Sequence, residues 1–182
     1  MHKIIPTTFT FISKFEKEKI LNLNKNVGII FRNYKIMINQ DLLIKVKKFC
    51  NMNNRKIYLA NNINLAAKLS FDGAYIPSFN KKVNLLTCQK KKKFLIMGSA
   101  HNLPEIKIKE KQGVEVIFLS PLFMTKNYKK KLGIIKFNIL TRLTKKKIIA
   151  LGGINKNNIK KIKITNAYGF SGISYFLDNL KK

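Results

Sequence analysis

His101 is the side chain of this sequence best suited to acid–base chemistry. The chain has two histidines, and the other, His2, stands next to the amino terminus. An unperturbed imidazole has a pKa of about 6.5, so it can take up and release a proton near neutral pH. The competing interpretation is a helix-capping role, because His101 directly precedes Asn102, where a helix is expected to begin.

Two glycine segments near the carboxyl end of the chain favour phosphate binding. Gly152-Gly153 and Gly172 each follow a short apolar run. Glycine lets backbone amides approach an anion, and a helix that follows contributes the positive end of its dipole. Because the two segments follow consecutive runs, they favour a phosphate site over ordinary turns. Hydroxyl groups in comparable places are candidate hydrogen-bond donors: Ser99, Thr125 and Ser174.

The acidic residues argue against a metal centre built from carboxylates. The chain has 8 of them; most fall on segments expected to be helical, while Asp72 and Glu115 lie at the starts of apolar runs. No Ser–His–Asp triad is apparent, and Cys50 and Cys88 lack the spacing of a zinc site. We expect buried thiols in a reducing compartment. The segment Ile4 to Ser13 is expected to contain the first strand and not to be a signal peptide, so we expect a cytoplasmic protein.

These residues need a scaffold that brings the ends of several apolar runs together. Eight such runs recur along the chain: Thr8–Ile12, Val27–Phe31, Ile57–Ala60, Gly73–Ile76, Phe94–Gly98, Val114–Leu119, Ile148–Leu151 and Phe170–Ile173. Continuous apolar runs are typical of parallel strands that are covered on both faces. Helices are expected between them: Glu16–Leu23, Asp41–Asn51, Asn62–Ser70, Asn102–Gln112, Gly133–Leu143 and Asn155–Ile164. The alternation predicts a compact single-domain (β/α)8 TIM barrel over residues 1–182, with a six- or seven-strand doubly wound sheet as the alternative.

The charge balance is the outlier of the composition. The 182 residues include 37 Lys and Arg and 8 Asp and Glu, which leaves a net charge of +29. Only three of the basic residues are arginine, the residue type that reads bases and phosphates best. No aromatic stacking pattern accompanies the lysine runs Lys90–Lys93, Lys129–Lys131, Lys145–Lys147 and Lys160–Lys163. We expect a solvated basic surface, with an inert barrel that binds nucleic acid as an alternative from another class.

No stretch reaches the roughly 18 apolar residues of a membrane helix, so no membrane partner is expected.

The order of the motifs resembles the thiamine-phosphate synthase/TenI family. The segments that carry the likeness are Gly98–Asn102, Leu119–Thr125 with Leu132-Gly133, Ala150–Ile154, Gly28–Arg32, Leu59–Ala66 and Asp72–Ile76. They follow one another in the family's order over roughly residues 8–176. The resemblance implies a compact (β/α)8 barrel that acts in thiamine biosynthesis.

The resemblance also implies roles for single residues. Gly152, Gly153, Ile173 and Ser174 would hold the phosphate of a thiazole phosphate, and Thr125 would lie near the thiazole carboxylate. Arg32 and Ser99 would face the diphosphate of a second substrate. His101 matches the histidine that shuttles a proton in the tautomerase members.

The main departure from the family pattern concerns magnesium. Asn61 and Asn80 stand where the synthases carry the two aspartates that bind Mg²⁺, which removes two formal charges. The thiazole-phosphate half of the site is thus kept and the diphosphate half is altered. This favours a TenI-like thiazole tautomerase that uses His101 and needs no cofactor.

Two other functions remain within the family resemblance. A thiamine-phosphate synthase would join thiazole phosphate to an aminopyrimidine diphosphate. It would need Mg²⁺, or positive charge from Lys35, Lys126 or Lys129 in its place. A non-catalytic regulator would bind thiazole phosphate alone. In each case the partner is a small molecule, nucleic acid is not expected, and a homo-oligomer stays open.

Overall fold

Eight parallel strands close into a barrel in the computed structural model, which describes residues 4–34, 39–83, 93–125, 130–172 and 175–176. Each strand pairs with its neighbours in sequence, and β8 pairs with β1 to close the ring. The strands are β1 Thr8–Ile12, β2 Val27–Phe31, β3 Ile57–Ala60, β4 Gly73–Ile76, β5 Leu95–Ala100, β6 Val116–Leu119, β7 Lys147–Leu151 and β8 Gly169–Ser171. The predicted (β/α)8 barrel is confirmed, and the doubly wound sheet is excluded because its two edges would not pair.

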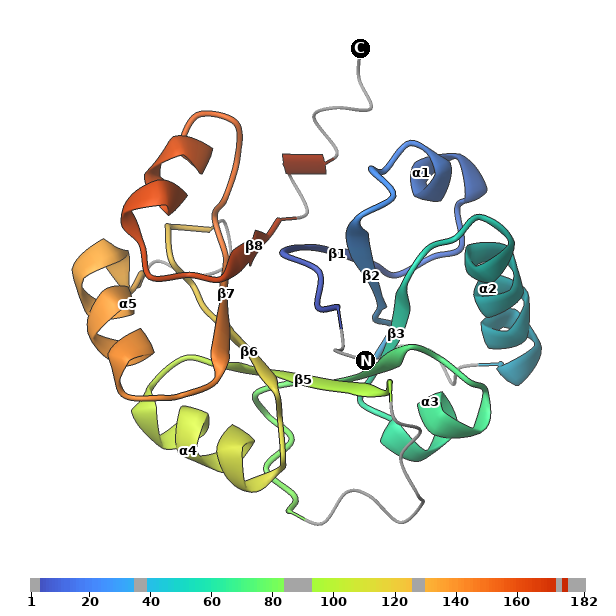
Figure 1. The fold of residues 1–182 in the computed structure, drawn as a ribbon, viewed down its shortest axis with the longest axis horizontal. Helices are drawn as coiled ribbons and strands as arrows, with labels where there is room; N and C mark the ends of the chain where they lie inside the picture. The colour runs from blue at the N-terminus through green and yellow to red at the C-terminus, as the bar shows by residue number, and fades with distance from the viewer. Residues whose placement is uncertain (1–3, 35–38, 84–92, 126–129, 173–174, 177–182) are drawn as a thin grey trace.

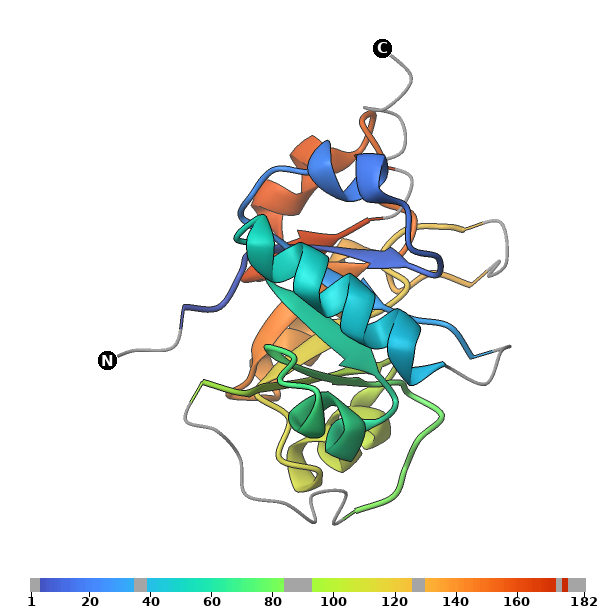
Figure 2. The same cartoon turned by 90° about the vertical axis from the view of Figure 1, so that its right-hand side faces the viewer.

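Helices surround the barrel strands (Figure 1). They are α1 Lys17–Leu21, α2 Gln40–Met52, α3 Ile63–Lys68, α4 Leu103–Lys111, α5 Gly133–Arg142 and the 3₁₀ helix η1 Ile159–Ile164. The side view shows α2 lying across the outside of the strands it connects (Figure 2). Among the described helices, none is long and apolar enough to cross a membrane.

Asparagine side chains begin three of these helices. Asn39 accepts a hydrogen bond from the Asp41 amide at 2.8 Å, and Asn62 accepts one from the Leu65 amide at 3.0 Å. Asn102 accepts one from the Glu105 amide at 3.0 Å. Each bond satisfies an amide that lacks a partner in the first helical turn. The helices that follow β3 and β5 therefore begin close to the carboxyl ends of those strands.

Several element bounds predicted from the sequence differ from the structure, and two of these differences have a clear physical reason. The run expected to end at Gly98 continues as β5 to Ala100, because Ser99 and Ala100 pair with Phe118 and Leu119 of β6. The helix expected over Asn155–Ile164 is a 3₁₀ helix that begins only at Ile159. Asn155 Oδ1 accepts from the Asn157 amide at 2.9 Å, and such local side-chain bonds compete with a regular α-helix.

Apolar side chains fill the inside of the barrel. Phe9, Phe11, Tyr58, Tyr75 and Phe118 are buried there with the aliphatic residues of the neighbouring strands. The Phe118 ring meets the Phe9 ring at a centroid distance of 5.1 Å and the Tyr75 ring at 5.3 Å, both edge to face. The interior is thus a packed core, and a ligand must bind at an end of the barrel.

A second apolar layer lies between the strands and the helices. Cys50 of α2 is fully buried in it, and burial raises the pKa of its thiol to about 11. The predicted burial of this thiol is confirmed, and its raised pKa keeps it protonated at neutral pH. Cys88 lies outside the described residues.

Candidate functional site

Polar side chains cap the packed interior at the carboxyl ends of the strands. Side chains alternate along a strand, so Arg32 follows Ile30, Ser99 follows Met97 and Ser120 follows Phe118 on the inward face. Ser99 and Ser120 are buried and Arg32 is half-buried. The same period-two pattern in the sequence would have identified Ser120, to which sequence reasoning assigned no role.

Arg32 and Ser99 both act on the Tyr75 side chain. The Arg32 guanidinium lies 4.5 Å from the centre of the Phe11 ring. Burial raises the pKa of Tyr75 to about 12, while a hydrogen bond to Ser99 and the charge of Arg32 act in the opposite direction. Sequence reasoning missed Tyr75, although its place in β4 puts it on the inward face between Ala60 and Met97.

The His101 ring is held between the end of β6 and the loop after β4. Its Nδ1 lies 2.8 Å from the Ser120 carbonyl oxygen and 3.2 Å from the Ser120 hydroxyl. Its Nε2 lies 3.1 Å from the Ser78 hydroxyl. A carbonyl only accepts, so Nδ1 carries the proton; in the neutral ring Nε2 is then the basic nitrogen and accepts from Ser78.

The helix-capping interpretation of His101 does not fit these contacts. Asn102 is the N-cap of α4, and the Glu105 carboxylate accepts from the His101 backbone amide at 2.9 Å. This is a reciprocal capping arrangement that uses the backbone of His101 and leaves its ring aside. The imidazole is therefore oriented by Ser78 and Ser120 and not by the helix.

Gly152 and Gly153 pack against the loop that follows β6. Both have positive φ angles, of 95° and 69°. A Cβ on Gly152 would lie 2.8 Å from the Pro121 Cα, and one on Gly153 would lie 2.3 Å from the Met124 carbonyl oxygen. These two positions require glycine for packing and backbone conformation, whatever ligand the loop binds.

Hydrogen bonds join the same two loops. The Leu122 amide donates to the Leu151 carbonyl at 2.8 Å, and the Phe123 amide donates to the Gly152 carbonyl at 3.1 Å. Thr125 is half-buried at the end of this stretch. Two of the predicted phosphate-binding residues, Ile173 and Ser174, lie outside the described residues. The structure therefore places only the other two, Gly152 and Gly153.

Asn61 and Asn80 come together, as expected for two positions that would share a metal. Their side chains bond to each other, with Asn80 Nδ2 donating to Asn61 Oδ1 at 2.8 Å. A hard dication such as Mg²⁺ prefers charged carboxylate oxygens, and this pair offers only neutral amides. Within the described ranges, three or more His, Cys, Asp or Glu side chains do not cluster anywhere as a metal site would need. These residues do not fit magnesium.

A pocket of about 550 Å³ lies beside this amide pair, with two lysines in its wall. It is lined by Asn61, Asn62, Phe79, Asn80, Lys81 and Lys82. The lysines that sequence reasoning offered as substitutes for magnesium lie outside the described residues: Lys35, Lys126 and Lys129. Lys81 and Lys82 were missed, although they directly follow Asn80 in the sequence.

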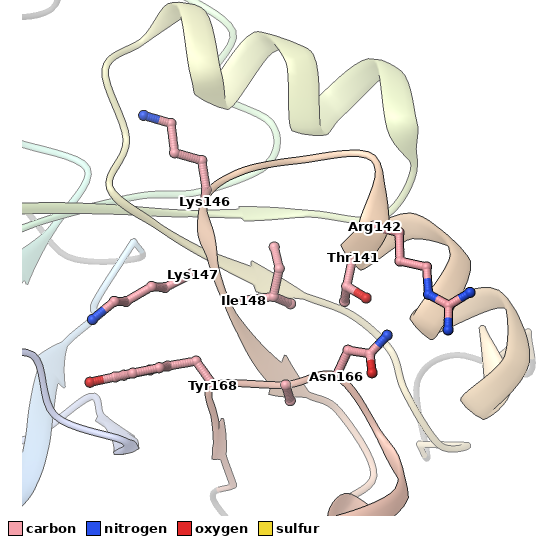
Figure 3. A pocket seen from close by; sticks show the side chains of 8 residues that line it. Thr141, Arg142, Lys146, Lys147, Ile148, Asn166 and Tyr168 are labelled. Atoms are coloured by element: carbon pink, nitrogen blue, oxygen red, sulfur yellow. The ribbon is translucent and has the colours of Figure 1, made fainter.

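A second pocket, of about 450 Å³, lies at the opposite end of the barrel. It surrounds the start of β7 and is lined by Thr141, Arg142, Lys146, Lys147, Ile148, Asn166, Ala167 and Tyr168. Its three cationic side chains point away from one another (Figure 3). The Lys147 ammonium lies 4.1 Å from the centre of the Tyr168 ring. Divergent charges make a poor binding site, so the carboxyl end of the barrel is the candidate site.

The eight parallel strands close into a barrel, and polar residues gather at the carboxyl ends of these strands. This arrangement defines a TIM-barrel protein, with the candidate site at the end of the barrel where this fold usually carries its active site. Residues 27–176 match the family model described as thiamine monophosphate synthase. The chain therefore belongs to the thiamine-phosphate synthase/TenI family, a family of thiamine biosynthesis. This confirms the family that the sequence motifs resembled.

Relatives and solved structures agree with this assignment. A putative thiamine-phosphate synthase 2 of Aquifex aeolicus is 30% identical over 130 residues, which cover 67% of this chain and 66% of the relative. A thiamine-phosphate synthase of Pelagibacter ubique is 27% identical, covering 100% of this chain and 90% of the relative. A thiamine phosphate pyrophosphorylase structure from Pyrococcus furiosus has a TM-score of 0.70 at 15% identity, covering 96% of this chain and 92% of that one. The structural match shows the shared fold.

Proposed function

We propose that this protein binds a thiazole phosphate and that His101 moves a proton on the thiazole ring, as in the TenI-like tautomerases. The observation that carries the proposal is the 2.8 Å hydrogen bond between the Asn61 and Asn80 amides. Coupling to a diphosphate requires positive charge at this point, whereas moving a proton within one ring does not. The altered half of the site is thus the half that a tautomerase does not use.

The contacts of His101 suit this chemistry. The Ser120 carbonyl holds the proton on Nδ1, so Nε2 can act as a base toward a substrate or through the Ser78 hydroxyl. Tautomerisation removes a proton from one atom of the ring and returns it to another. One histidine can perform both steps and ends in its starting form, and such acid–base catalysis contributes about 10²- to 10⁴-fold in rate.

The remaining residues would bind and orient the substrate. The Gly152-Gly153 segment, with Ile173 and Ser174, would hold the phosphate through backbone amides and a hydroxyl. Thr125 would lie near the thiazole carboxylate. Arg32 and Ser99, which gather around Tyr75, would form the opposite wall.

The test is a proton-transfer assay with thiazole phosphate carboxylate, followed by NMR, on the wild type and His101→Gln. We expect the variant to lose at least about 100-fold in turnover and to keep its affinity in calorimetry. His2→Gln is the matched control, because it removes the other histidine. Full turnover in His101→Gln would contradict the role of His101.

Thiamine-phosphate synthase is the second candidate, and the lysine-walled pocket supports it. Lys81 and Lys82 lie beside the amide pair, where they would neutralise a diphosphate in place of a metal. The relatives from Aquifex and Pelagibacter carry the name of this activity.

The synthase candidate is tested by diphosphate release from thiazole phosphate and the aminopyrimidine diphosphate. Release without Mg²⁺ that disappears in the Lys81→Ala, Lys82→Ala double variant would support it. Absence of release at every Mg²⁺ concentration would exclude coupling.

A further inference from the structure

Lys109 of α4 is a fully buried lysine, with 0% of its surface exposed. Lysine is almost never buried to this extent unless its charge has partners. Its ammonium donates to the Pro77 carbonyl at 2.8 Å, the Asn80 carbonyl at 2.9 Å and Gln112 Oε1 at 2.9 Å. An ammonium has three N–H groups, so these acceptors use all of them.

Gln112 completes this arrangement. Its side-chain amide donates to the Asn80 carbonyl at 2.9 Å and to the Lys82 carbonyl at 2.8 Å, while its oxygen accepts from Lys109. Lys109 and Gln112, here called the loop clamp, thus bind three backbone carbonyls within residues 77–82. The Pro77 carbonyl also accepts from the Asn80 amide at 3.1 Å within the loop, so the clamp adds support that comes from α4.

The barrel wall makes room for the lysine. A Cβ on Gly98 of β5 would lie 2.9 Å from Lys109 Cδ. A side chain here would therefore push on the middle of the lysine stem, where little adjustment is available. Burial lowers the pKa of Lys109 to about 8, with the nearby Glu105 carboxylate acting in the opposite direction. Burying this amine is thus unfavourable in itself, and the bonds to the loop carbonyls offset that cost.

The clamped loop carries both side chains that complete the site from the β4 side. Its Ser78 hydroxyl lies 3.1 Å from His101 Nε2, and its Asn80 amide bonds to Asn61 at 2.8 Å. We propose that Lys109 is a positioning residue: it holds the loop 77–82 so that Ser78 meets His101 and Asn80 meets Asn61. Its relevance to catalysis rests on the proposed function of His101, whereas the positioning itself is a property of the protein without substrate.

The test uses the double variant Lys109→Met, Gln112→Leu. It removes the buried charge and its amide partner together, so no buried charge stays unpaired, while the loop carbonyls of Pro77, Asn80 and Lys82 lose these donors. Lys111→Met is the matched control, since Lys111 is exposed on the same helix. The protein is ¹⁵N-labelled and no ligand is added.

Two measurements report on the loop directly. We expect amide hydrogen exchange within residues 78–82 to rise at least about 10-fold in the double variant and to stay unchanged in the control. We also expect the ¹⁵N shift of His101 Nε2 to change as the Ser78 hydrogen bond weakens. Unchanged exchange and an unchanged Nε2 shift in a folded double variant would overturn the proposal.

A milder variant keeps the test decisive if the double variant does not fold. Gln112→Leu removes the contacts to Asn80 and Lys82 and leaves Lys109 in place, and we expect the same changes at a smaller size. Slow exchange with the wild-type Nε2 shift in this variant would also overturn the proposal.

Turnover separates the positioning role from the proposed function. Where the wild type transfers the proton, we expect the double variant to lose about 10-fold in kcat with little change in KM, because the base is misplaced and the phosphate loops are intact. A wild type without proton transfer would refute the function of His101, while a looser loop in the double variant would still support the clamp.

Discussion

At the carboxyl end of the barrel, backbone forms one side of the candidate site and side chains form the other. On the β6–β7 side, the backbone forms the site: Gly152 and Gly153 lie against Pro121 and Met124 at distances that exclude any Cβ. On the β3–β4 side, side chains form it: the Asn80 amide bonds to Asn61. A site made of side chains can change its chemistry by one substitution that leaves the backbone in place. The two departures that the sequence predicts at the magnesium positions, Asn61 and Asn80, both lie on the β3–β4 side.

The loop clamp explains how the β3–β4 side, which carries Asn61 and Asn80, keeps its backbone conformation. Lys109 and Gln112 bind loop carbonyls, which every residue provides whatever its side chain. The loop after β4 can thus exchange side chains, including those at positions 78 and 80, without losing its support. Its shape and its chemistry are determined by separate residues.

Among the substitutions that test this difference between the two sides, Gly153→Ala is expected to have the largest effect on the free energy of unfolding. The new Cβ would meet the Met124 carbonyl oxygen at 2.3 Å, and φ is 69°. We expect a loss of roughly 3 kcal/mol of unfolding free energy, about 1 from the backbone conformation and the rest from overpacking. Urea unfolding measures it.

Gly133→Ala is the control for that substitution. Gly133 has a similar φ of 70°, and a Cβ there would have no neighbour within 4 Å. Only the conformational cost of about 1 kcal/mol is expected. Equal losses in the two variants would mean that packing against the β6 loop contributes nothing at Gly153.

Asp72→Asn is expected to have the next largest effect, since Asp72 anchors the start of β4. Its carboxylate accepts from Lys47 at 2.9 Å, from Lys56 at 2.8 Å and from the Ile57 amide at 3.1 Å. Lys47 is nearly buried, so we expect a loss of roughly 2 kcal/mol in unfolding free energy at pH 7. A loss as small as that of an exposed ion pair, under about 0.5 kcal/mol, would contradict this anchoring role.

The same carboxylate predicts a pH dependence. Burial alone would raise the pKa of Asp72, but the hydrogen bonds from Lys56, Lys47 and the Ile57 amide outweigh it and lower the pKa. A lowered folded-state pKa means that the stabilisation is present above the unfolded value of about 3.9 and is lost as pH falls through the folded value. Urea unfolding from pH 5 to pH 2 should show a shallower decline in Asp72→Asn than in the wild type.

Restoring the two carboxylates tests the altered side directly. In the Asn61→Asp, Asn80→Asp double variant, two carboxylates would replace amides that now bond at 2.8 Å. We expect a loss of about 1 kcal/mol without metal, from repulsion between exposed charges, and recovery on adding Mg²⁺. Thermal unfolding with and without Mg²⁺ measures both. Mg²⁺ stabilisation of equal size in the wild type would contradict the conclusion that the amide pair does not fit magnesium.

The smallest effect is expected for the binding of nucleic acid to the exposed lysines. The lysines that the structure describes in the runs 145–147 and 160–163 are largely exposed, which suits a solvated surface. We expect duplex DNA and RNA to bind weakly at low salt and not measurably at about 150 mM salt, as for phosphate contacts without base contacts. Filter binding across a salt series measures it, and tight binding at about 150 mM would revive the nucleic-acid alternative.

The sequence by itself determined the strands and the family. The bounds of Ile57–Ala60 and Gly73–Ile76 agree with the prediction, because strands covered on both faces are apolar throughout and are visible as continuous runs. Gly153 and His101 were also identified from the sequence as candidate site residues, since each has a residue type that few positions tolerate or need. A local pattern of this kind requires no knowledge of what lies across the barrel.

Only the tertiary structure decided which of these residues meet. Ser78 and His101 are 23 positions apart, Asn61 and Asn80 are 19 apart, and Lys109 and Pro77 are 32 apart. The alternating lysines of α4 give no local sign that Lys109 is buried while Lys107 and Lys111 are exposed. Barrel closure sets these pairs, because the loops after successive strands converge at one end regardless of their separation in the chain.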